Sequence, residues 1–556
     1  MKPECSQSSP LPSSPSVTVP SRRNRSRWRI TTALAGVLSI GLASCDLSPE
    51  YHPQKFLYPK GWEGQGMMGN AQPADGVVRS DWWTMFNDPI LDGLEKRMLA
   101  VNPDLQAEAE AFTQARDVAR ETESRLYPQV TGGAHMSDNK GSIGRLYNNP
   151  ARSTSLVYES NQAYSGAATW EPDFWNSIRN TTRMQKNLAQ ASAGQYALAR
   201  LSLEAELASD YIALRGLDAQ NAVYDDSIRY FRAAVEITEL RQAGSIGAGL
   251  DVSRAETQLY SAQASKSNLI ASRNVMEHAI AVLLNTAPAG FHIAPVKDVK
   301  MHFGVLKINA GLPASLLERR PDIAIAERQM AASARAIGVS RAAFYPHITF
   351  SADGGFEDGG FDLASISRAF WKIAVQAVEP AFTGGLRRAA LQRSWSQYRG
   401  MVDNYRSVVL SAFQDVEDGL TQTRQFKVAQ DQQQKAVDAA LRTQSMTMAL
   451  YTGGLSNYLD ALVAQQDALQ ARLAEVEVQT AQVQSSVRLV RALGGGWNAS
   501  DLPGIKQIDP FGPLQYGDLR TPKAVNGIDN HASPLDNDLR GDHVSDNVSQ
   551  GLTGRP

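Results

Sequence analysis

Apolar residues recur at alternating steps of four and three positions along two long stretches of the chain. In the later stretch the repeat is carried by Leu455, Leu459, Leu462, Leu469, Leu473, Val476, Val483, Val487 and Val490, with polar Gln466 and Thr480 at the two remaining positions. In the earlier stretch it is carried by Leu198, Leu201, Ala205, Ala208 and Ile212. A repeat of about 3.5 residues is typical of helices that supercoil around neighbouring helices. Both stretches are therefore predicted to be long, packed helices.

Proline is absent from residues 173–287 and from residues 381–502. Because proline costs about 3 kcal/mol inside a helix, both parts are predicted to be helical over most of their length. Each is interrupted once by glycine, at residues 244–249 and 453–454. Glycine supplies the left-handed backbone that reverses a helix, so each part is predicted to form a helical hairpin. The first arm, about residues 176–242, would be roughly 100 Å long at 1.5 Å per residue.

Four shorter segments alternate between apolar and polar residues, as strands with one buried face do. They lie at residues 129–136, 164–170, 347–356 and 371–377. Each is about 10 residues long, the length that crosses a membrane as a tilted strand with one face to lipid and the other to water. For any one segment taken alone, a strand of a soluble sheet is the alternative. Four strands cannot close a barrel, and a membrane tolerates no open sheet edge, so several chains are expected to share one barrel.

Four short landmarks occur twice in the same order and predict an internal duplication. The pairs are residues 102–105 with 320–323, 126–130 with 344–348, 171–174 with 379–382, and 249–252 with 458–461. The spacing between the second and third landmarks is ten residues longer in the first copy. These additional residues are rich in Gly and Asn, and we expect them to form a loop around residues 139–142.

The N-terminus has the pattern of a targeting segment. A basic run at residues 22–29 precedes an apolar stretch at residues 32–43. That stretch is shorter than the roughly 20 residues of a permanent membrane helix, but it suits a signal peptide. It ends in Leu-Ala-Ser-Cys45, which resembles the bacterial lipobox. Cys45 is therefore predicted to carry diacylglycerol and palmitate and to begin the mature chain. The alternative is an ordinary secretory signal with an incidental cysteine. Asp46 favours inner-membrane retention in enteric bacteria, so location depends on the rest of the chain.

These patterns divide the chain into six expected parts. They are a signal peptide and leader (1–44), a lipid-anchored N-terminal segment (45–87), a first repeat (88–295), a linker (296–311), a second repeat (312–500) and a tail (501–556). Each repeat is expected to contain a helix, a pair of strands and a long helical hairpin. The tail is rich in Asp, Asn, Gly and Pro, a composition that favours disorder.

Composition excludes several other classes of protein. The 55 Lys and Arg residues are balanced by 57 Asp and Glu residues, so the chain lacks the basic excess of a nucleic-acid-binding protein. Its only cysteines, Cys5 and Cys45, lie near the N-terminus, which excludes a disulfide framework. The sequence has no HExxH metal motif, no GxSxG nucleophile elbow and no phosphate-binding glycine loop. We therefore expect no enzymatic activity, no metal and no cofactor apart from the covalent lipid.

Several longer segments carry a family resemblance. They are residues 82–91 (WWTMFNDPIL), 316–328 (LLERRPDIAIAER), 379–385 (EPAFTGG) and 492–497 (ALGGGW). Together they resemble the TolC-like outer-membrane efflux channels, in particular the lipoprotein subfamily often called OprM or NodT type. The resemblance covers about residues 45–500.

The resemblance implies a mainly α fold with a membrane β-barrel part. Duplicated helical hairpins would form a trimeric α-barrel tunnel, and four strands per chain would contribute to a shared 12-stranded barrel. It also implies a homotrimer in the outer membrane that meets a periplasmic membrane-fusion adaptor and an inner-membrane pump, usually of the resistance-nodulation-division class. The expected function is export of drugs and toxic solutes. Metal-ion efflux or type I protein secretion on the same fold is the alternative, and a periplasmic coiled-coil scaffold is a further one.

Two sites follow from the resemblance and the glycine turns. The turns are expected to contact the adaptor through six residues, Gly247, Gly249, Leu250, Gly453, Gly454 and Leu455. In the subfamily, the helix after the second turn commonly reads Tyr-Leu-x-x-Leu-Asp-Ala-Gln-Arg, and its Asp and Arg help to close the periplasmic end.

Here Val463 and Gln466 stand at those Asp and Arg positions. Replacing both partners of an ion pair is often close to neutral. We therefore expect an apolar periplasmic gate in which Leu459 and Val463 face the channel axis one turn apart and close it by dewetting. Asp460 and Asp251 lie nearby, either as cation-attracting groups or as capping and helix-surface residues.

Overall fold

The computed structural model describes residues 46–52, 61–62, 80–140, 158–298, 316–358 and 368–508, with residues 158–160 described by their backbone alone. The chain divides into two compact units, Met1–Asp46 and Leu47–Pro556, and every helix and strand named below belongs to the second. Cys45, the expected signal peptide, residues 299–311 of the expected linker and residues 509–556 of the expected tail lie outside the described residues.

The elements follow the same order twice. The first series is η2 (Trp82–Phe86), α2 (Pro89–Val101), α3 (Pro103–Ser124), β1 (Gln129–Lys140), β2 (Tyr158–Trp170), α4 (Ser177–Ala243) and α5 (Gly249–Leu283). The second is α6 (Leu316–Arg319), α7 (Pro321–Ala342), β3 (His347–Asp358), β4 (Ala369–Val378), α8 (Leu386–Thr452), α9 (Tyr458–Ala492) and η6 (Ala499–Asp501). Corresponding helices have equal lengths: 22 residues in α3 and α7, 67 in α4 and α8, and 35 in α5 and α9. The expected fold class, mainly helical with four strands, is confirmed.

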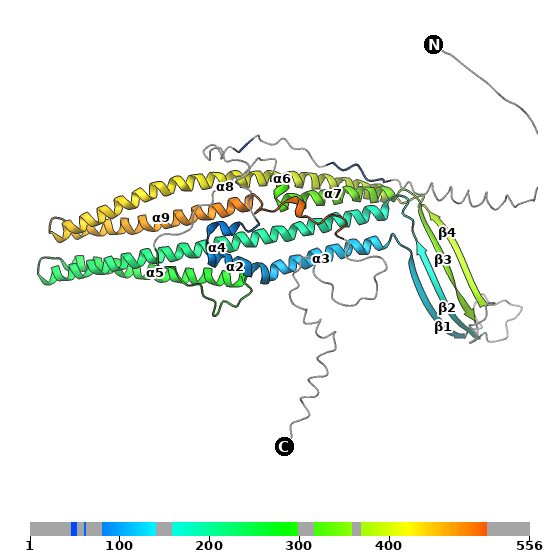
Figure 1. Ribbon diagram of the computed structural model, residues 1–556, viewed down its shortest axis with the longest axis horizontal. Helices are drawn as coiled ribbons and strands as arrows, with labels where there is room; N and C mark the ends of the chain where they lie inside the picture. Colours follow the sequence, from blue (N-terminus) through cyan, green and yellow to red (C-terminus); the bar gives the residue numbers. More distant parts are fainter. Residues whose placement is uncertain are drawn as a thin grey trace, which may run out of the picture. The chain divides into compact units, whose positions relative to one another are not determined.

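The long helices lie side by side and change neighbours along their length (Figure 1). Near the sheet, α4 packs between α3 and α7, and α7 also packs on α8. Near the turns, α4 packs on α5 and α9, and α9 packs on α8. Both helical turns lie at the end of the bundle opposite the sheet (Figure 1). Within the described ranges no helix has the length and apolar character needed to cross a bilayer.

The strands form one antiparallel sheet in the order β1-β2-β3-β4. The two central strands come from different copies of the duplication and pair through Gly166 with Gly354 and Trp170 with Phe350. The outer edges of β1 and β4 have no partner strand among the described residues.

The predicted loop around residues 139–142 begins later than expected, because Asn139 and Lys140 pair with β2 and extend β1. Seventeen residues separate β1 from β2, against ten between β3 and β4, and β2 is three residues longer than β4.

The apolar repeat of α9 divides into two parts. Val476, Val483, Val487 and Val490 are buried, as are Leu201, Ala205, Ala208 and Ile212 of α4. Towards the turn the buried face of α9 instead consists of Tyr458, Ala461 and Ala464, while Leu455 and Leu459 are exposed. The repeat predicted the helix, but only the part farther from the turn packs into the core of the chain along this face.

A buried ionic network holds the end of the expected first repeat, at residues 293–294, against the first hairpin. Asp218 accepts hydrogen bonds from Arg215 Nη1 at 2.9 Å and Arg273 Nε at 2.6 Å, and Arg273 also pairs with Glu277. The two guanidinium groups donate to the carbonyls of Ala294 and Ile293 at 2.8 and 2.6 Å. Buried charges are stable only when they are paired and hydrogen-bonded in this way.

Candidate functional site

The second helical turn has a glycine in the left-handed region, as predicted. Gly454 has a φ of 74°, and the amide of Leu455 donates to the carbonyl of Leu450 at 2.8 Å. This bond across the last helical turn is the Schellman arrangement, which satisfies a free carbonyl at a helix end. Gly453 precedes it as the C-cap of α8, with a φ of −75°.

The first turn uses a different residue for the same purpose. Ser245, with a φ of 62°, occupies the left-handed position, so the expectation that glycine supplies it is wrong here. Gly247 packs closely against the preceding helical turn, because a Cβ at this position would lie 3.0 Å from Arg241 Cβ and 3.2 Å from the Arg241 carbonyl carbon. Gly249 begins α5, and Leu250 follows it.

Both turns present apolar side chains to solvent. Ile246 is 70% exposed and Leu250 59% exposed in the first turn, and Leu455 is 81% exposed in the second. Exposed apolar groups gathered on a small surface are typical of a contact site. All six predicted contact residues therefore lie at the two turns, and the predicted contact with an adaptor stays a prediction.

A contact that the sequence did not suggest joins the two hairpins behind their turns. Arg241 Nη1 donates to the Tyr451 carbonyl at 2.9 Å, and its guanidinium carbon lies 4.7 Å from the centroid of the Tyr451 ring. Tyr451 packs edge-on against Tyr458, with ring centroids 5.3 Å apart. Burial raises the pKa of Tyr458 to about 12. Ala234, Ala255, Met448 and Ala461 complete this apolar cluster, so all four long helices contribute to it.

The two predicted gate residues lie outside the core of the chain. Leu459 is 46% exposed and Val463 is 48% exposed, one turn apart on α9. The buried residues Tyr458 and Ala461 occupy a different face of the same helix. The described contacts thus leave Leu459 and Val463 available to another chain or to the channel, and their role as a gate stays a prediction.

The polar residues around the predicted gate are engaged in local contacts. Gln466, at the position of the family arginine, donates to Gln258 Oε1 of α5 at 2.8 Å. Asn457 accepts from the Asp460 amide at 3.0 Å, and Ser456 Oγ donates to Asp460 Oδ2 at 2.7 Å. Asp251 pairs with Arg254 at 3.7 Å. Asp460 therefore belongs to the helix cap, which was one of its two expected roles.

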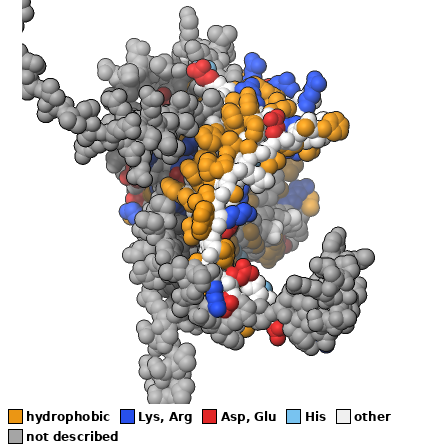
Figure 2. Space-filling model, turned by 90° about the vertical axis from the view of Figure 1, so that its right-hand side faces the viewer, with side chains coloured by type: hydrophobic (Ala, Val, Ile, Leu, Met, Phe, Trp, Pro, Cys, Tyr) orange, Lys and Arg blue, Asp and Glu red, His pale blue; other side chains and the backbone are white. Residues whose placement is uncertain are grey.

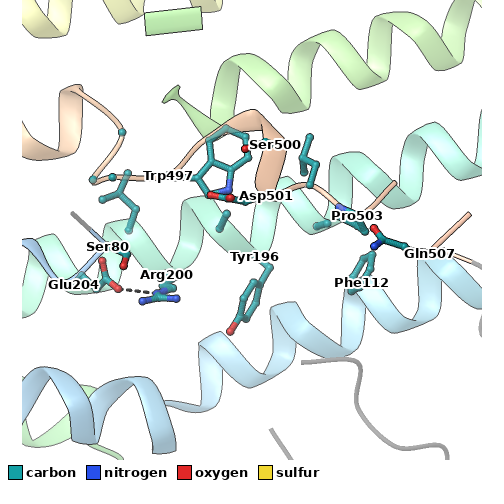
Figure 3. A pocket seen from close by; sticks show the side chains of 17 residues that line it. Ser80, Phe112, Tyr196, Arg200, Glu204, Trp497, Ser500, Asp501, Pro503 and Gln507 are labelled. Atoms are coloured by element: carbon teal, nitrogen blue, oxygen red, sulfur yellow. Dashed lines mark hydrogen bonds and ion pairs between the residues drawn. The ribbon is translucent and has the colours of Figure 1, made fainter. Parts of the chain in front are cut away.

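A cavity of about 660 Å³ lies between α3, α4 and the segment that follows α9 (Figure 3). Glu204 on its wall accepts hydrogen bonds from Arg200 Nε at 2.7 Å and from the buried Trp82 Nε1 at 3.3 Å. Glu95 of α2 is fully buried, and neither of its carboxyl oxygens has a hydrogen-bond partner among the described residues. Burial, and then the charge of Glu204, raises the pKa of Glu95 well above its usual value. The Trp82–Glu204 hydrogen bond joins η2 to α4.

The start of the second unit is held on α7 close to the sheet. Arg341 Nη1 donates to the Leu47 carbonyl at 3.0 Å, and Arg335 Nη1 donates to Ser48 Oγ at 2.8 Å. Tyr51 donates to Glu327 Oε1 at 2.6 Å, so the segment 47–51 runs along α7 away from β3. In the part of the chain that the structure describes, no group of three or more His, Cys, Asp or Glu side chains is placed to hold a metal ion.

Known proteins are similar to this chain in sequence and in fold. Residues 94–286 and 312–495 match the model of the family described as outer membrane efflux protein. The pyoverdine export outer membrane protein OpmQ of Pseudomonas aeruginosa is 28% identical over 477 residues, which cover 84% of this chain and 97% of OpmQ. The toluene efflux pump outer membrane protein TtgC of Pseudomonas putida is 27% identical and covers 82% of this chain, with 93% of its own length matched. Nodulation protein T of Rhizobium leguminosarum is 28% identical, with 84% of this chain and 98% of that protein covered.

Solved structures agree with this assignment. The outer-membrane channel OprN superposes with a TM-score of 0.74 at 25% identity, covering 82% of this chain and all of OprN. The Campylobacter jejuni CmeC channel superposes with a TM-score of 0.76 at 21% identity, covering 82% of this chain and 96% of CmeC, and shows the fold alone. The family model covers both copies of the duplication, and the relatives are channels, so the chain belongs to the outer membrane efflux protein family and is an efflux channel, not an enzyme.

Proposed function

We propose that this chain forms, as a homotrimer, the outer-membrane conduit of a tripartite pump that exports small molecules from a Gram-negative cell. The observation that carries the proposal is one four-stranded sheet at the end of 67-residue helices, whose two outer edges have no partner strand in the part of the chain that the structure describes. Open edges are unstable in lipid, so the sheet needs neighbouring copies on both sides. Three copies would supply a 12-stranded barrel continuous with a helical tunnel.

Small molecules are the proposed cargo because two of the relatives are named for the export of a small molecule. OpmQ is named for pyoverdine export and TtgC for toluene efflux. The partners are a periplasmic membrane-fusion adaptor and an inner-membrane pump of the resistance-nodulation-division class, which supplies the energy. The adaptor would dock on the exposed turns around Leu250 and Leu455. Leu459 and Val463, in the first turns of α9 next to the second exposed turn, would form the apolar gate.

The proposed anchor is a diacylglycerol and palmitate group on Cys45, in the outer membrane. Support comes from the position of Leu47, two residues later, on the last turns of α7. β3 begins six residues after Arg341, so the mature start of the chain would lie at the end of the helices that meets the membrane. An anchor there and a barrel beside it would enter the same bilayer.

The proposal is tested with the full chain in three measurements. Light scattering of detergent-extracted protein should give three times the protomer mass. Planar bilayers should show channel conductance. A strain lacking its own efflux channels should regain resistance to organic solvents and antibiotics when the chain is expressed with its adaptor and pump. A monodisperse monomer with an intact β-signal in circular dichroism would refute the shared barrel. Restored metal resistance or protein secretion, without drug resistance, would refute the proposed cargo.

A further inference from the structure

The cavity between α3, α4 and the segment after α9 has the size and the lining of a small-molecule site. Its volume of about 660 Å³ lies within the range of ligand pockets, which combine aromatic and apolar walls with a few polar groups. Phe112 and Leu201 line it and are 5% and 6% exposed. Tyr196 and Trp497 add two further rings, both partly exposed. In Figure 3, Tyr196 extends from α4 towards α3, and Trp497 stands on the segment that follows α9.

Several hydrogen-bond donors of this cavity are free. In the part of the chain that the structure describes, neither the Trp497 Nε1 nor the Tyr196 hydroxyl has a hydrogen-bond partner, and neither atom is buried. Arg200 uses its Nε for Glu204, and its two terminal nitrogens bond to no described group. Gln507 uses only its Oε1, which leaves its amide nitrogen available. The lining therefore offers donors from α4 and from the segment after α9 to a ligand with oxygen acceptors.

The charges on the lining disfavour an anionic ligand. The Arg200 guanidinium is already paired with Glu204 at 2.7 Å. The other carboxylate of the lining, Asp501, accepts from the Asn498 amide at 3.0 Å through one oxygen, so its second oxygen can accept from a ligand. A phosphate or a carboxylate in the cavity would meet two acidic groups and a single cation that is already neutralised.

The spacing of the aromatic rings disfavours a compact cation. A quaternary ammonium group is held by rings that close around it. Phe112, Tyr196 and Trp497 come from three separate segments, and no ring contact joins any two of them among the described residues. Rings spread over a cavity suit an extended ligand with several weakly apolar faces and polar edges. A short oligosaccharide has this character, because the C–H face of a sugar packs on an aromatic ring while its hydroxyl groups exchange hydrogen bonds.

We propose that this cavity binds a short chain of N-acetylated sugars. The acetamido group matches the lining, since its carbonyl accepts from the free donors and its methyl group packs on Phe112 and Leu201. Only the source of the sugar rests on the proposed function: the helices of an outer-membrane conduit lie in the periplasm, beside the glycan of the cell wall. The same chemistry is present in free oligosaccharides released from that glycan.

The test uses the full-length trimer in detergent. Chitotetraose, a soluble chain of N-acetylglucosamine units, is titrated by isothermal calorimetry, and retention on purified peptidoglycan sacculi is measured by sedimentation. We expect saturable binding of chitotetraose and no binding of cellotetraose, which lacks the acetamido groups. Chitotetraose should also compete for retention on the sacculi.

Two substitutions locate the site. Trp497→Ala removes one ring and should weaken chitotetraose binding at least tenfold. Tyr196→Phe keeps the ring, removes only a free hydroxyl and should weaken binding about three- to tenfold.

Matched controls lie outside the cavity. Hydrophobic side chains gather along one face of the sheet in Figure 2, and Trp371 of β4 is 79% exposed. Tyr260 of α5 is 61% exposed. Trp371→Ala and Tyr260→Phe should bind chitotetraose as wild type does. Light scattering checks that each variant is a trimer.

The outcomes separate this inference from the proposed function. Chitotetraose binding without retention on sacculi would support the site and assign it to free oligosaccharides. Binding that both cavity variants leave unchanged would overturn the location, and equal affinity for cellotetraose would overturn the choice of an acetamido sugar. A trimer that conducts in planar bilayers but does not bind chitotetraose would overturn the inference and leave the conduit intact.

Discussion

The guanidinium group of Arg241 lies 4.7 Å from the centroid of the Tyr451 ring and donates a 2.9 Å hydrogen bond to the carbonyl of the same residue. Arg241 is in the last turn of α4, and Tyr451 is in the last turn of α8. A single side chain thus joins the two hairpins, through two residues that are 210 positions apart in sequence. A cation at a helix C-terminus is also favoured by the exposed carbonyls there.

Loss of this contact should loosen the end of the channel. Arg241→Met keeps the aliphatic stem but removes the hydrogen bond and the cation–π contact, which we expect to weaken the link by about 2 kcal/mol. The resting conductance of the trimer in planar bilayers should rise. Arg232→Met, an exposed position on the same helix, is the matched control. Equal resting conductance in both variants would show that Arg241 does not hold the hairpins together.

Substitutions of Val463 test whether the gate is apolar. Val463→Ser makes the constriction easier to hydrate and should raise the conductance of the closed state, with little dependence on salt. Val463→Asp should raise it further, whereas Val463→Ile should not. The measurement is single-channel conductance across a range of salt concentrations. A wild-type channel that opens steeply with salt or pH would instead indicate a gate held by carboxylates.

The exposed turn is best tested at Leu455. Gly454 has a φ of 74°, so a larger residue there strains the backbone as well as changing the surface. Leu455 is 81% exposed, and Leu455→Arg should leave the fold and the trimer intact. We expect at least a tenfold loss of resistance in a susceptibility assay, with Leu455→Met close to wild type. Full resistance in the arginine variant would remove this turn from the adaptor contact.

Glu95 makes stability depend on pH. Its pKa is raised in the folded state by burial first and by the charge of Glu204 second, while Arg200 opposes and Asp92 reinforces the shift. The folded chain therefore keeps this proton at pH values where the unfolded chain, with a pKa near the ordinary value, has lost it. The stabilising contribution is complete below the unfolded pKa and is lost as the pH rises towards the folded pKa.

Glu95→Gln should remove this pH dependence. The variant should unfold at a higher temperature than wild type at pH 7, by an amount corresponding to about 1–3 kcal/mol, and the difference should shrink near pH 4. Thermal unfolding of the trimer followed by circular dichroism gives both values. A wild-type stability that rises with pH in this range would contradict the assignment.

Local patterns in the sequence were enough for most of the architecture. The proline-free stretches, the steps of four and three, and the alternating segments predicted the helices and strands, because each reflects a period set by the backbone itself. The duplication gave the equal lengths of α4 and α8. The same patterns located both turns, since closely spaced glycines at the end of an apolar repeat favour a helix end.

Tertiary structure decided the features that depend on residues far apart in the chain. One local feature also went against the expectation: Ser245, not glycine, takes the left-handed position of the first turn, where its amide donates to the Gln242 carbonyl and the Ile246 amide to the Arg241 carbonyl. Tertiary packing separated Leu459 from the buried face of α9, because α4, α5 and α8 pack against Tyr458 and Ala461 on another face of the helix. The contact of Arg241 with Tyr451 and the burial of Glu95 have no signal in a linear pattern. Each arises only when separate helices meet, and the free energy of a charged or polar group is set by what surrounds it.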